Sequence, residues 1–288
     1  MTVASMLSGR TKDLGGGFMI RRLLPDATRQ AVGPFLFMDH FGPVTQRPED
    51  DFDVRPHPHI GLATVTYLFE GAMLHRDSLG TVQRIEPGAI NWMTAGRGIV
   101  HSERSPDDLR AVARRVHGLQ LWVGLPQAFE ETDPAFAHTP AADIPVVQGE
   151  NTTMRVLIGS AGGATSPVST LVSTLYLDID AAPGGRIVLP PDSDEKAVYP
   201  LTDALRVDGT DVAPRTLAVF RPGLPVEIRA PSGGRFVIIG GAPMDGRRHM
   251  WWNFVSSRRE RIEEAKADWR AQRMGHVPGE TELIPLPD

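Results

Sequence analysis

Two pairs of side chains in the first half of the chain have the types and the spacing of metal ligands. His57 and His59 are separated by one residue, and so are His101 and Glu103. On a β-strand, side chains at positions i and i+2 point to the same face, so each pair directs two ligands the same way. If the two strands face each other, three imidazoles and one carboxylate meet at one point. The spacing therefore predicts a metal site built from these four residues.

The remaining histidines lack such company. Six of the nine histidines lie between residues 40 and 117, and none lies between residues 139 and 248, so we expect one metal site and none in the second half. A lone histidine is more often a packing or hydrogen-bonding residue than a ligand. We give that role to His40, His75, His117, His138, His249 and His276. Arg76 and Asp77 beside His75 could orient ligands from behind, but we favour a salt bridge between strands.

The ligand types favour a divalent first-row metal. Four protein ligands on an octahedral ion leave two positions open, as oxygen chemistry on Fe(II) requires. Neutral imidazoles, one carboxylate and a divalent ion leave a formal charge of about +1, which favours an anionic chelating oxygen ligand such as an enolate or phenolate. We therefore expect Fe(II), with Mn, Ni, Co, Cu or Zn as alternatives.

Composition excludes several classes of protein. The chain has 288 residues, which suits two domains or one large one, and a net charge of −5, which does not favour direct binding of nucleic acid. The absence of cysteine excludes disulfides, thiolate metal sites and cysteine nucleophiles. The first residues show no signal peptide, and no apolar stretch approaches the roughly 20 residues that cross a membrane. We expect a soluble cytoplasmic protein with no membrane partner.

Many short strands are expected, because 29 glycines and 25 prolines are spread along the whole chain. This rhythm is typical of an all-β barrel or sandwich. One strand should run from His57 to about Phe69, with its odd-numbered side chains facing an apolar interior unless Gly61 hosts a bulge. Residues 1–17 are expected to be a loosely held arm, and residues 126–145 a crossing between domains.

The end of the chain changes character. Ser257 and Glu260 match a capping box, and Ile262, Ala265 and Trp269 then fall on one face of a helix. We predict a helix over about residues 257–273, stopped near Gly275, that packs its apolar stripe on the β body. The tryptophans at 251, 252 and 269 are interpreted as core residues.

The motifs around these residues resemble those of the pirin family in the cupin superfamily. They cover most of the chain and comprise GPF (33–35), DHFGP (39–43), RPHPHIG (55–61), EG (70–71), HRDS (75–78), WMTAGRGIVHSE (92–103) and WWNFVSS (251–257). The resemblance implies two tandem antiparallel cupin barrels that face each other, with Fe(II) in the first barrel only. The family's ligand motif falls on His57, His59, His101 and Glu103. A typical cupin carries its glutamate soon after the histidine pair, whereas here the carboxylate comes from Glu103, as in pirins.

The expected domains are residues 1–135, a cupin barrel with the metal site; residues 136–250, a cupin barrel without metal ligands; and residues 251–288, a C-terminal helix and tail packed on the body. The second half has the same strand rhythm as the first, although no residue-level repeat is visible.

The resemblance leaves two functions open. Bacterial pirins resemble quercetin 2,3-dioxygenases, which open a flavonol ring with O2 and release carbon monoxide. The chain would then act on a small planar polyphenol and O2, with Glu103 as ligand and general base together. Other family members are metal-binding regulators without turnover, which would require a protein partner. The ligand set is the same in both cases, so it does not decide between them.

Overall fold

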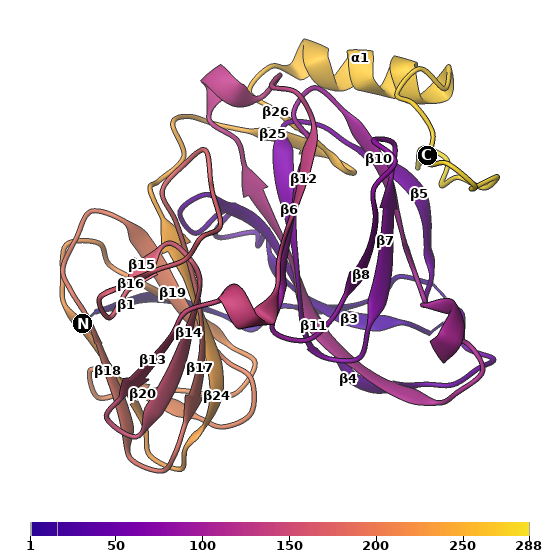
Figure 1. Cartoon of the computed structure of the whole chain (residues 1–288). Helices are drawn as coiled ribbons and strands as arrows, with labels where there is room; N and C mark the ends of the chain where they lie inside the picture. Colours follow the sequence, from indigo (N-terminus) through magenta and orange to yellow (C-terminus); the bar gives the residue numbers. More distant parts are fainter. Residues whose placement is uncertain (1, 16, 288) are drawn as a thin grey trace. The chain divides into compact units, whose positions relative to one another are not determined.

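The computed structural model describes residues 2–15 and 17–287, and about half of these residues lie in short antiparallel strands (Figure 1). They form two compact units, and both units are discontinuous in sequence. The ligand unit, named for the predicted metal ligands that it contains, comprises residues 11–21, 38–141 and 244–287. The second unit comprises residues 2–10, 22–37 and 142–243. The domain division expected from the sequence, at residues 135 and 250, stays a prediction.

Two larger sheets and a hairpin build the ligand unit. The first sheet has the order β12 (Ala135–Thr139), β9 (Ile90–Thr94), β6 (Leu62–Glu70), β11 (Arg114–Gly124), β4 (Phe35–Gln46), β3 (Met19–Leu24) and β2 (Arg10–Asp13). The second has the order β5 (Val54–His59), β10 (Ile99–Arg104), β7 (Met73–Asp77) and β8 (Val82–Ile85). The hairpin pairs β25 (His249–Trp251) with β26 (Phe254–Ser256). The 3-10 turns are η1 (Asp107–Leu109), η2 (Gln127–Phe129) and η3 (Ala141–Asp143), whose last two residues lie in the second unit.

The second unit repeats this plan. Its larger sheet has the order β1 (Val3–Leu7), β22 (Leu217–Phe220), β19 (Glu195–Pro200), β24 (Gly234–Gly241), β17 (Thr174–Ala181), β14 (Thr152–Ile158) and β13 (Val146–Gly149). Its smaller sheet has the order β18 (Gly185–Leu189), β23 (Val226–Ala230), β20 (Leu205–Val207) and β21 (Thr210–Val212). A short hairpin joins β15 (Ser160–Ala161) to β16 (Ala164–Thr165). Apolar side chains from the larger and the smaller sheet pack into one buried core, which includes Val156, Val198 and Ile238.

The C-terminal helix α1 (Arg259–Arg270) lies beside the hairpin β25–β26, as Figure 1 shows. The predicted stripe is confirmed: Ile262, Ala265 and Trp269 are buried and pack with Phe254. The predicted capping box is wrong. The residue before the helix is Arg258, which makes no side-chain cap, and the Ser257 hydroxyl donates instead to the Glu130 carboxylate at 2.8 Å.

The strand expected from His57 to Phe69 is two strands in different sheets. The extended conformation is interrupted at Gly61, where φ is +70°, and β5 and β6 then belong to different sheets. A β-carbon on Gly61 would collide with the carbonyl oxygen of Val255, so the close approach of the C-terminal hairpin also requires glycine there. The predicted parity between the two histidines and residues 63–69 therefore does not apply.

The expectation for the N-terminal residues is wrong. Residues 1–17 are not a loose arm, because β1 pairs with β22 in the second unit and β2 joins the first sheet of the ligand unit. Met1 and Gly16 of that stretch lie outside the described residues. Residues 126–145 do contain the passage from the ligand unit to the second unit, at residues 141 and 142, and they also contain β12, which pairs with β9 as an edge strand.

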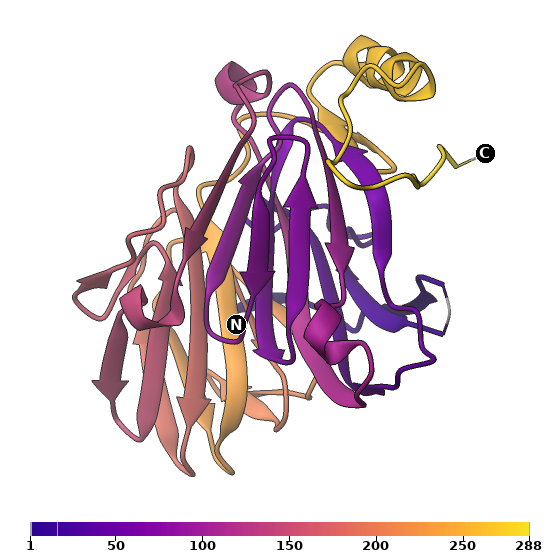
Figure 2. The ribbon, with the colours of Figure 1, turned by 45° about the vertical axis from the view of Figure 1, so that its right-hand side comes forward.

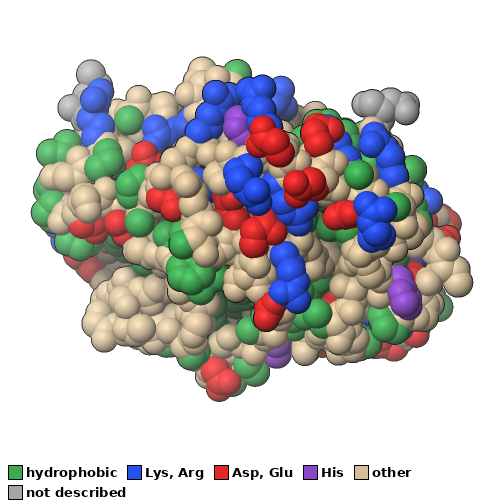
Figure 3. Space-filling model, turned by 90° about the horizontal axis from the view of Figure 1, so that it is seen from above, with side chains coloured by type: hydrophobic (Ala, Val, Ile, Leu, Met, Phe, Trp, Pro, Cys, Tyr) green, Lys and Arg blue, Asp and Glu red, His purple; other side chains and the backbone are tan. Residues whose placement is uncertain are grey.

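Charges of both signs are interspersed on the face seen in Figure 3. On and around α1, ion pairs join Arg261 to Glu131 and Arg273 to Asp268. Within the described residues, α1 is the one α-helix, and it is too short and too polar to cross a membrane.

The glycine requirement at the sheet break can be tested by replacing Gly61 with alanine. We expect a larger loss of unfolding free energy than in Gly80→Ala, measured in urea. Gly80 has φ +89° and open space around its β-carbon position, so its variant bears only the left-handed backbone penalty of about 1–2 kcal/mol. Equal losses in the two variants would contradict the clash with Val255.

Candidate metal centre

Strands β5 and β10 bring the predicted ligands together through their register. The two strands are antiparallel neighbours, with His57 opposite His101 and Ile99 opposite His59. The register shifts between His101 and Glu103, so that Glu103 lies opposite Val54 instead of Arg55. On the other side of β10 the register is regular, and Glu103 lies opposite His75 of β7. The sheet therefore places all four predicted residues on two adjacent strands.

Three histidines form one buried cluster. One ring nitrogen from each of His57, His59 and His101 lies within 4.8 Å of the others. Their rings are 4.3 to 5.0 Å apart between centroids, and the edge of Trp122 closes one side of His59 at 5.2 Å. The structure thus brings together the three histidines that the spacing predicted.

Several buried polar atoms in this cluster have no hydrogen-bond partner among the described residues. They are Nδ1 of His59, Nε2 of His101 and Oε1 of Glu103. His57 Nδ1 donates to the carbonyl oxygen of Arg55 at 2.9 Å, which leaves its Nε2 unprotonated in the neutral ring. Buried polar atoms are normally satisfied, so unpaired ones that converge are what a metal site requires. The donor set therefore fits a divalent metal.

The electrostatics of the cluster favour neutral imidazoles. Burial lowers the pKa of His57 to about 4, helped by the neighbouring His75. Burial also lowers the pKa values of His59 and His101 well below the ordinary range, and the other histidines add to this effect. A neutral imidazole is the form that binds a metal, so all three rings are ready to do so at physiological pH.

Glu103 is half-buried, with its Oε1 atom buried, and its carboxylate is not among the ligand atoms that lie within 4.8 Å of one another. Burial raises the pKa of Glu103 to about 7, and a hydrogen bond with Thr66 only partly opposes this shift. Thr66 lies on β6, a strand of the other sheet. The role of Glu103 as a fourth ligand stays a prediction.

Behind the cluster lies a pair of residues that the spacing argument undervalued. His75 Nδ1 is 3.3 Å from Nδ1 of His101, and the ring of His75 stacks on Phe136 at 4.4 Å. Asp77 is hydrogen-bonded to His75 on its own strand instead of forming a salt bridge with a neighbouring strand. The signal was present in the sequence: His75 and Asp77 repeat the spacing of the two ligand pairs.

The C-terminal segment covers the reverse face of the ligand strand. Because side chains alternate along β10, Val100, Ser102 and Arg104 face away from the histidines. Val100 packs in a cluster with Trp269 and Val277, and the Ser102 hydroxyl donates to Glu280 at 2.9 Å. Figure 2 shows this segment, in yellow, as an extended stretch after α1. Nothing in the spacing of the ligands announced this contact.

Arg104 anchors the same segment by charge. Its guanidinium donates to both carboxylate oxygens of Glu280, from Nε at 3.0 Å and from Nη2 at 2.5 Å. The side chains are only 15% and 11% exposed, so the pair is poorly screened by water. The hydrogen bonds from Arg104 lower the pKa of Glu280. A backbone bond from Ile284 to the carbonyl of Pro56 fastens the segment to β5 as well.

Other predicted structural histidines have partners of that kind. His40 and His117 form a buried pair with their Nε2 atoms 2.8 Å apart, and His138 Nδ1 lies 2.7 Å from the Asn91 side-chain oxygen. None of these is among the three clustered histidines.

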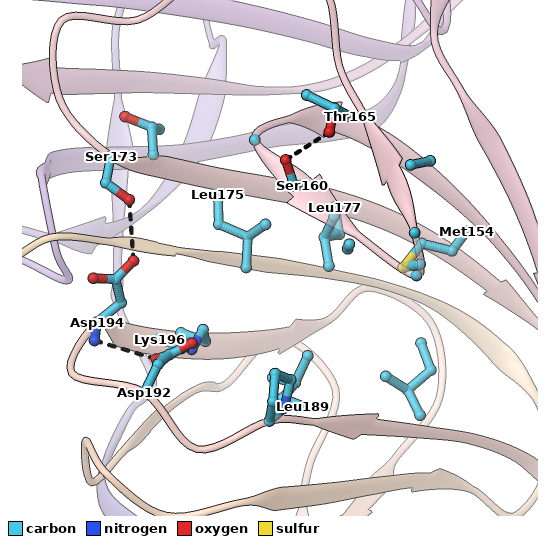
Figure 4. Close-up of a pocket in the computed structure, with 18 of the residues that line it drawn as sticks. Met154, Ser160, Thr165, Ser173, Leu175, Leu177, Leu189, Asp192, Asp194 and Lys196 are labelled. Carbon is cyan, nitrogen blue, oxygen red and sulfur yellow. Dashed lines mark hydrogen bonds and ion pairs between the residues drawn. The ribbon is translucent and has the colours of Figure 1, made fainter.

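A cavity of about 750 Å³ lies in the second unit, far in the sequence from the histidine cluster (Figure 4). Its wall is apolar at Leu175, Leu177 and Leu189. The polar groups at its rim pair with one another, as in the contacts of Lys196 with Asp192 and of Ser173 with Asp194. The cavity is a feature of the second unit and contains none of the predicted ligands.

The raised pKa of Glu103 predicts a pH-dependent stability of the metal-free protein. Because the folded state holds the proton between about pH 4.5 and 7 while the unfolded state releases it, stability should fall as pH rises through this window. Glu103→Gln should remove that loss, so its stability relative to the unaltered protein should grow by roughly 3 kcal/mol from pH 4 to pH 8. Chelator-treated samples unfolded in urea would give the comparison, and a difference independent of pH would contradict it.

The anchoring of the C-terminal segment predicts unequal roles for two glutamates that both contact Arg104. Glu280→Gln should cost about 1–2 kcal/mol of unfolding free energy, because it weakens a largely buried charged pair. Glu282 is 56% exposed, so Glu282→Gln should cost below about 0.5 kcal/mol. Denaturant unfolding of both variants tests this order, and similar values would argue against the anchor.

Comparison with known proteins identifies the family of the chain. Family models match twice, as Pirin over residues 17–123 and as the Pirin C-terminal cupin domain over residues 176–275. The chain is 44% identical to a pirin-like protein of Caulobacter vibrioides, over 98% of this chain and 99% of that one. It is 33% identical to human pirin, over 96% and 94% of the two chains.

A crystal structure of a quercetin 2,3-dioxygenase from Acinetobacter baumannii is also similar. It superposes with a TM-score of 0.92 at 35% identity, over 99% of this chain and 95% of that one. The predicted all-β fold with two tandem cupin barrels and a C-terminal helix is confirmed. The chain belongs to the pirin family.

Proposed function

We propose that the chain is a metal-dependent dioxygenase that opens the ring of flavonol-like substrates such as quercetin and releases carbon monoxide. The observation that carries this proposal is the buried cluster of three neutral histidines beside the unpartnered carboxyl oxygen of Glu103. Similarity along nearly the whole chain to a solved quercetin 2,3-dioxygenase supports it.

In this proposal His57, His59, His101 and Glu103 hold one divalent metal. Fe(II) is our first choice, and Mn, Ni, Co, Cu and Zn are alternatives that the donor types also permit. When bound, the metal would supply a Lewis-acidic position for an anionic oxygen of the substrate and for O2.

The protein's own groups would prepare the substrate. The carboxylate of Glu103 accepts the proton of the flavonol 3-hydroxyl at its unpartnered oxygen, which makes the substrate the anion that a centre of about +1 formal charge favours. The imidazoles stay neutral, so they add no competing positive charge and donate no proton to the substrate. The ring of Trp122 packs against His59, with the two ring centroids 5.2 Å apart.

The reaction can be tested directly. The protein is loaded with Fe(II) without oxygen, mixed with quercetin and exposed to air, while flavonol absorbance and carbon monoxide are followed together. We expect the flavonol absorbance to decrease and one carbon monoxide to be released per flavonol consumed. His59→Ala and Glu103→Ala should abolish both changes. His249→Ala should keep the activity, because His249 lies on β25 outside the cluster.

Metal binding without turnover would contradict the dioxygenase proposal. That outcome would favour the alternative of a metal-binding regulatory protein, and the search would turn to a protein partner. Loading the same protein with Ni(II), Mn(II), Co(II), Cu(II) or Zn(II) tests the choice of Fe(II). We also propose the cytoplasmic location that is expected from the sequence.

A further inference from the structure

Three buried side chains form a continuous line behind the histidine cluster. His101 Nδ1 lies 3.3 Å from His75 Nδ1, and His75 Nε2 lies 3.0 Å from Oδ2 of Asp77. These residues are 1%, 3% and 0% exposed. The other oxygen of Asp77 accepts backbone N–H groups of Leu79 at 2.9 Å and of Thr81 at 3.0 Å. The line therefore runs from a candidate ligand to a turn of the backbone.

With His75 and His101 both neutral, the contacts in this line have one consistent set of directions. A carboxylate that already accepts two backbone N–H groups is an acceptor for His75 too, so His75 Nε2 carries a proton and donates it. In the neutral ring, His75 Nδ1 is then an acceptor. It receives the hydrogen of His101 Nδ1, and this leaves the proton off Nε2 of His101. That nitrogen is the buried one without a partner among the described residues.

We propose that His75 and Asp77 are positioning residues, which together hold His101 in the tautomer that presents an unprotonated Nε2 to the metal. The proposal rests on the metal site of the proposed function but not on its reaction. Hydrogen bonding of a ligand's second ring nitrogen sets both its orientation and its basicity, and the loss of such a partner typically weakens metal binding 10- to 100-fold.

The line makes a specific prediction for Asp77→Asn, a change that keeps size and shape. The amide oxygen of the new side chain would take the two backbone N–H groups, so its NH2 group would face His75. His75 would then accept at Nε2 and donate from Nδ1, and His101 would have to move its proton onto Nε2. The change would therefore block the ligating nitrogen. The same logic explains why an aspartate-to-asparagine change in a serine protease triad selects the wrong histidine tautomer.

Removing His75 should be milder than reversing it. In His75→Phe the stacking on Phe136 is kept, and His101 is free to leave its proton on Nδ1. We expect the Kd for Ni(II), measured by chelator competition, to rise about 10-fold in His75→Phe and about 100-fold in Asp77→Asn. The double variant should return to the value of His75→Phe alone. A packing role predicts the opposite order, because Asp77→Asn changes the volume least.

A matched control is available in the same unit. His40 is 3% exposed, like His75, and also lies against a second histidine. His40→Gln should lower the melting temperature of the metal-free protein while leaving the Kd for Ni(II) unchanged. If it weakens Ni(II) binding as much as Asp77→Asn does, the effect is general loss of packing and the proposal is wrong.

The unaltered metal-free protein gives a second test that needs no variant. Nitrogen-15 chemical shifts of its histidine rings distinguish the two neutral tautomers. We expect His101 to be protonated at Nδ1 and His75 at Nε2, and the reverse pattern would overturn the proposal. Neither the Ni(II) measurement nor the chemical shifts require a flavonol. Absence of turnover would therefore contradict the proposed reaction but not the positioning role of His75 and Asp77.

Discussion

Three buried imidazoles whose centroids lie 4.3 to 5.0 Å apart are most stable together when none of them is charged, and their hydrogen-bond partners suit that condition. Burial removes the water that would stabilise an imidazolium, so each ring must keep one proton and place it where an acceptor waits. For His57 the acceptor is the carbonyl of Arg55, and for His101 it is the ring of His75. The nitrogens left over then converge without protons. The neutral charge of the rings therefore determines their tautomers, and the tautomers determine which nitrogens can bind a metal.

The alternation of side chains along β10 gives that strand two duties. Its odd-numbered residues supply His101 and Glu103 to the interior, whereas Ser102 and Arg104 on the other face bind Glu280. Side chains on the two faces of β10 belong to one backbone, so a loosely packed outer face would allow His101 and Glu103 to move as well. The packed and charge-paired C-terminal segment is thus the support of the ligand strand, although it contributes no atom to the cluster.

The i, i+2 spacing of the histidines predicted their cluster well, because this spacing is local and places both side chains on the same face of a strand. Parity failed at Gly61, where a contact with Val255, almost two hundred positions away, decides the backbone. The capping box predicted at Ser257 failed for a similar reason, since Glu130 accepts the hydrogen bond of the hydroxyl that would cap α1. The pairing of β1 with β22 was also not predicted, because a strand of five residues carries little signal without its partner. The fold class followed from turn chemistry, whereas the long-range contacts that complete the site did not.

Each unit is completed by a segment from the opposite end of the chain. Val3–Leu7 adds a strand to a sheet whose other members all come after residue 145, and residues 244–287 complete the unit that holds the histidines. During synthesis the chain leaves the ribosome from its N-terminus, so His57, His59 and His101 emerge long before the residues that brace their strand. A nascent chain therefore carries every histidine of the cluster while Ser102 and Arg104 still lack Glu280. The contacts of Ser102 and Arg104 with Glu280 can therefore form only after all three histidines of the cluster have been synthesised.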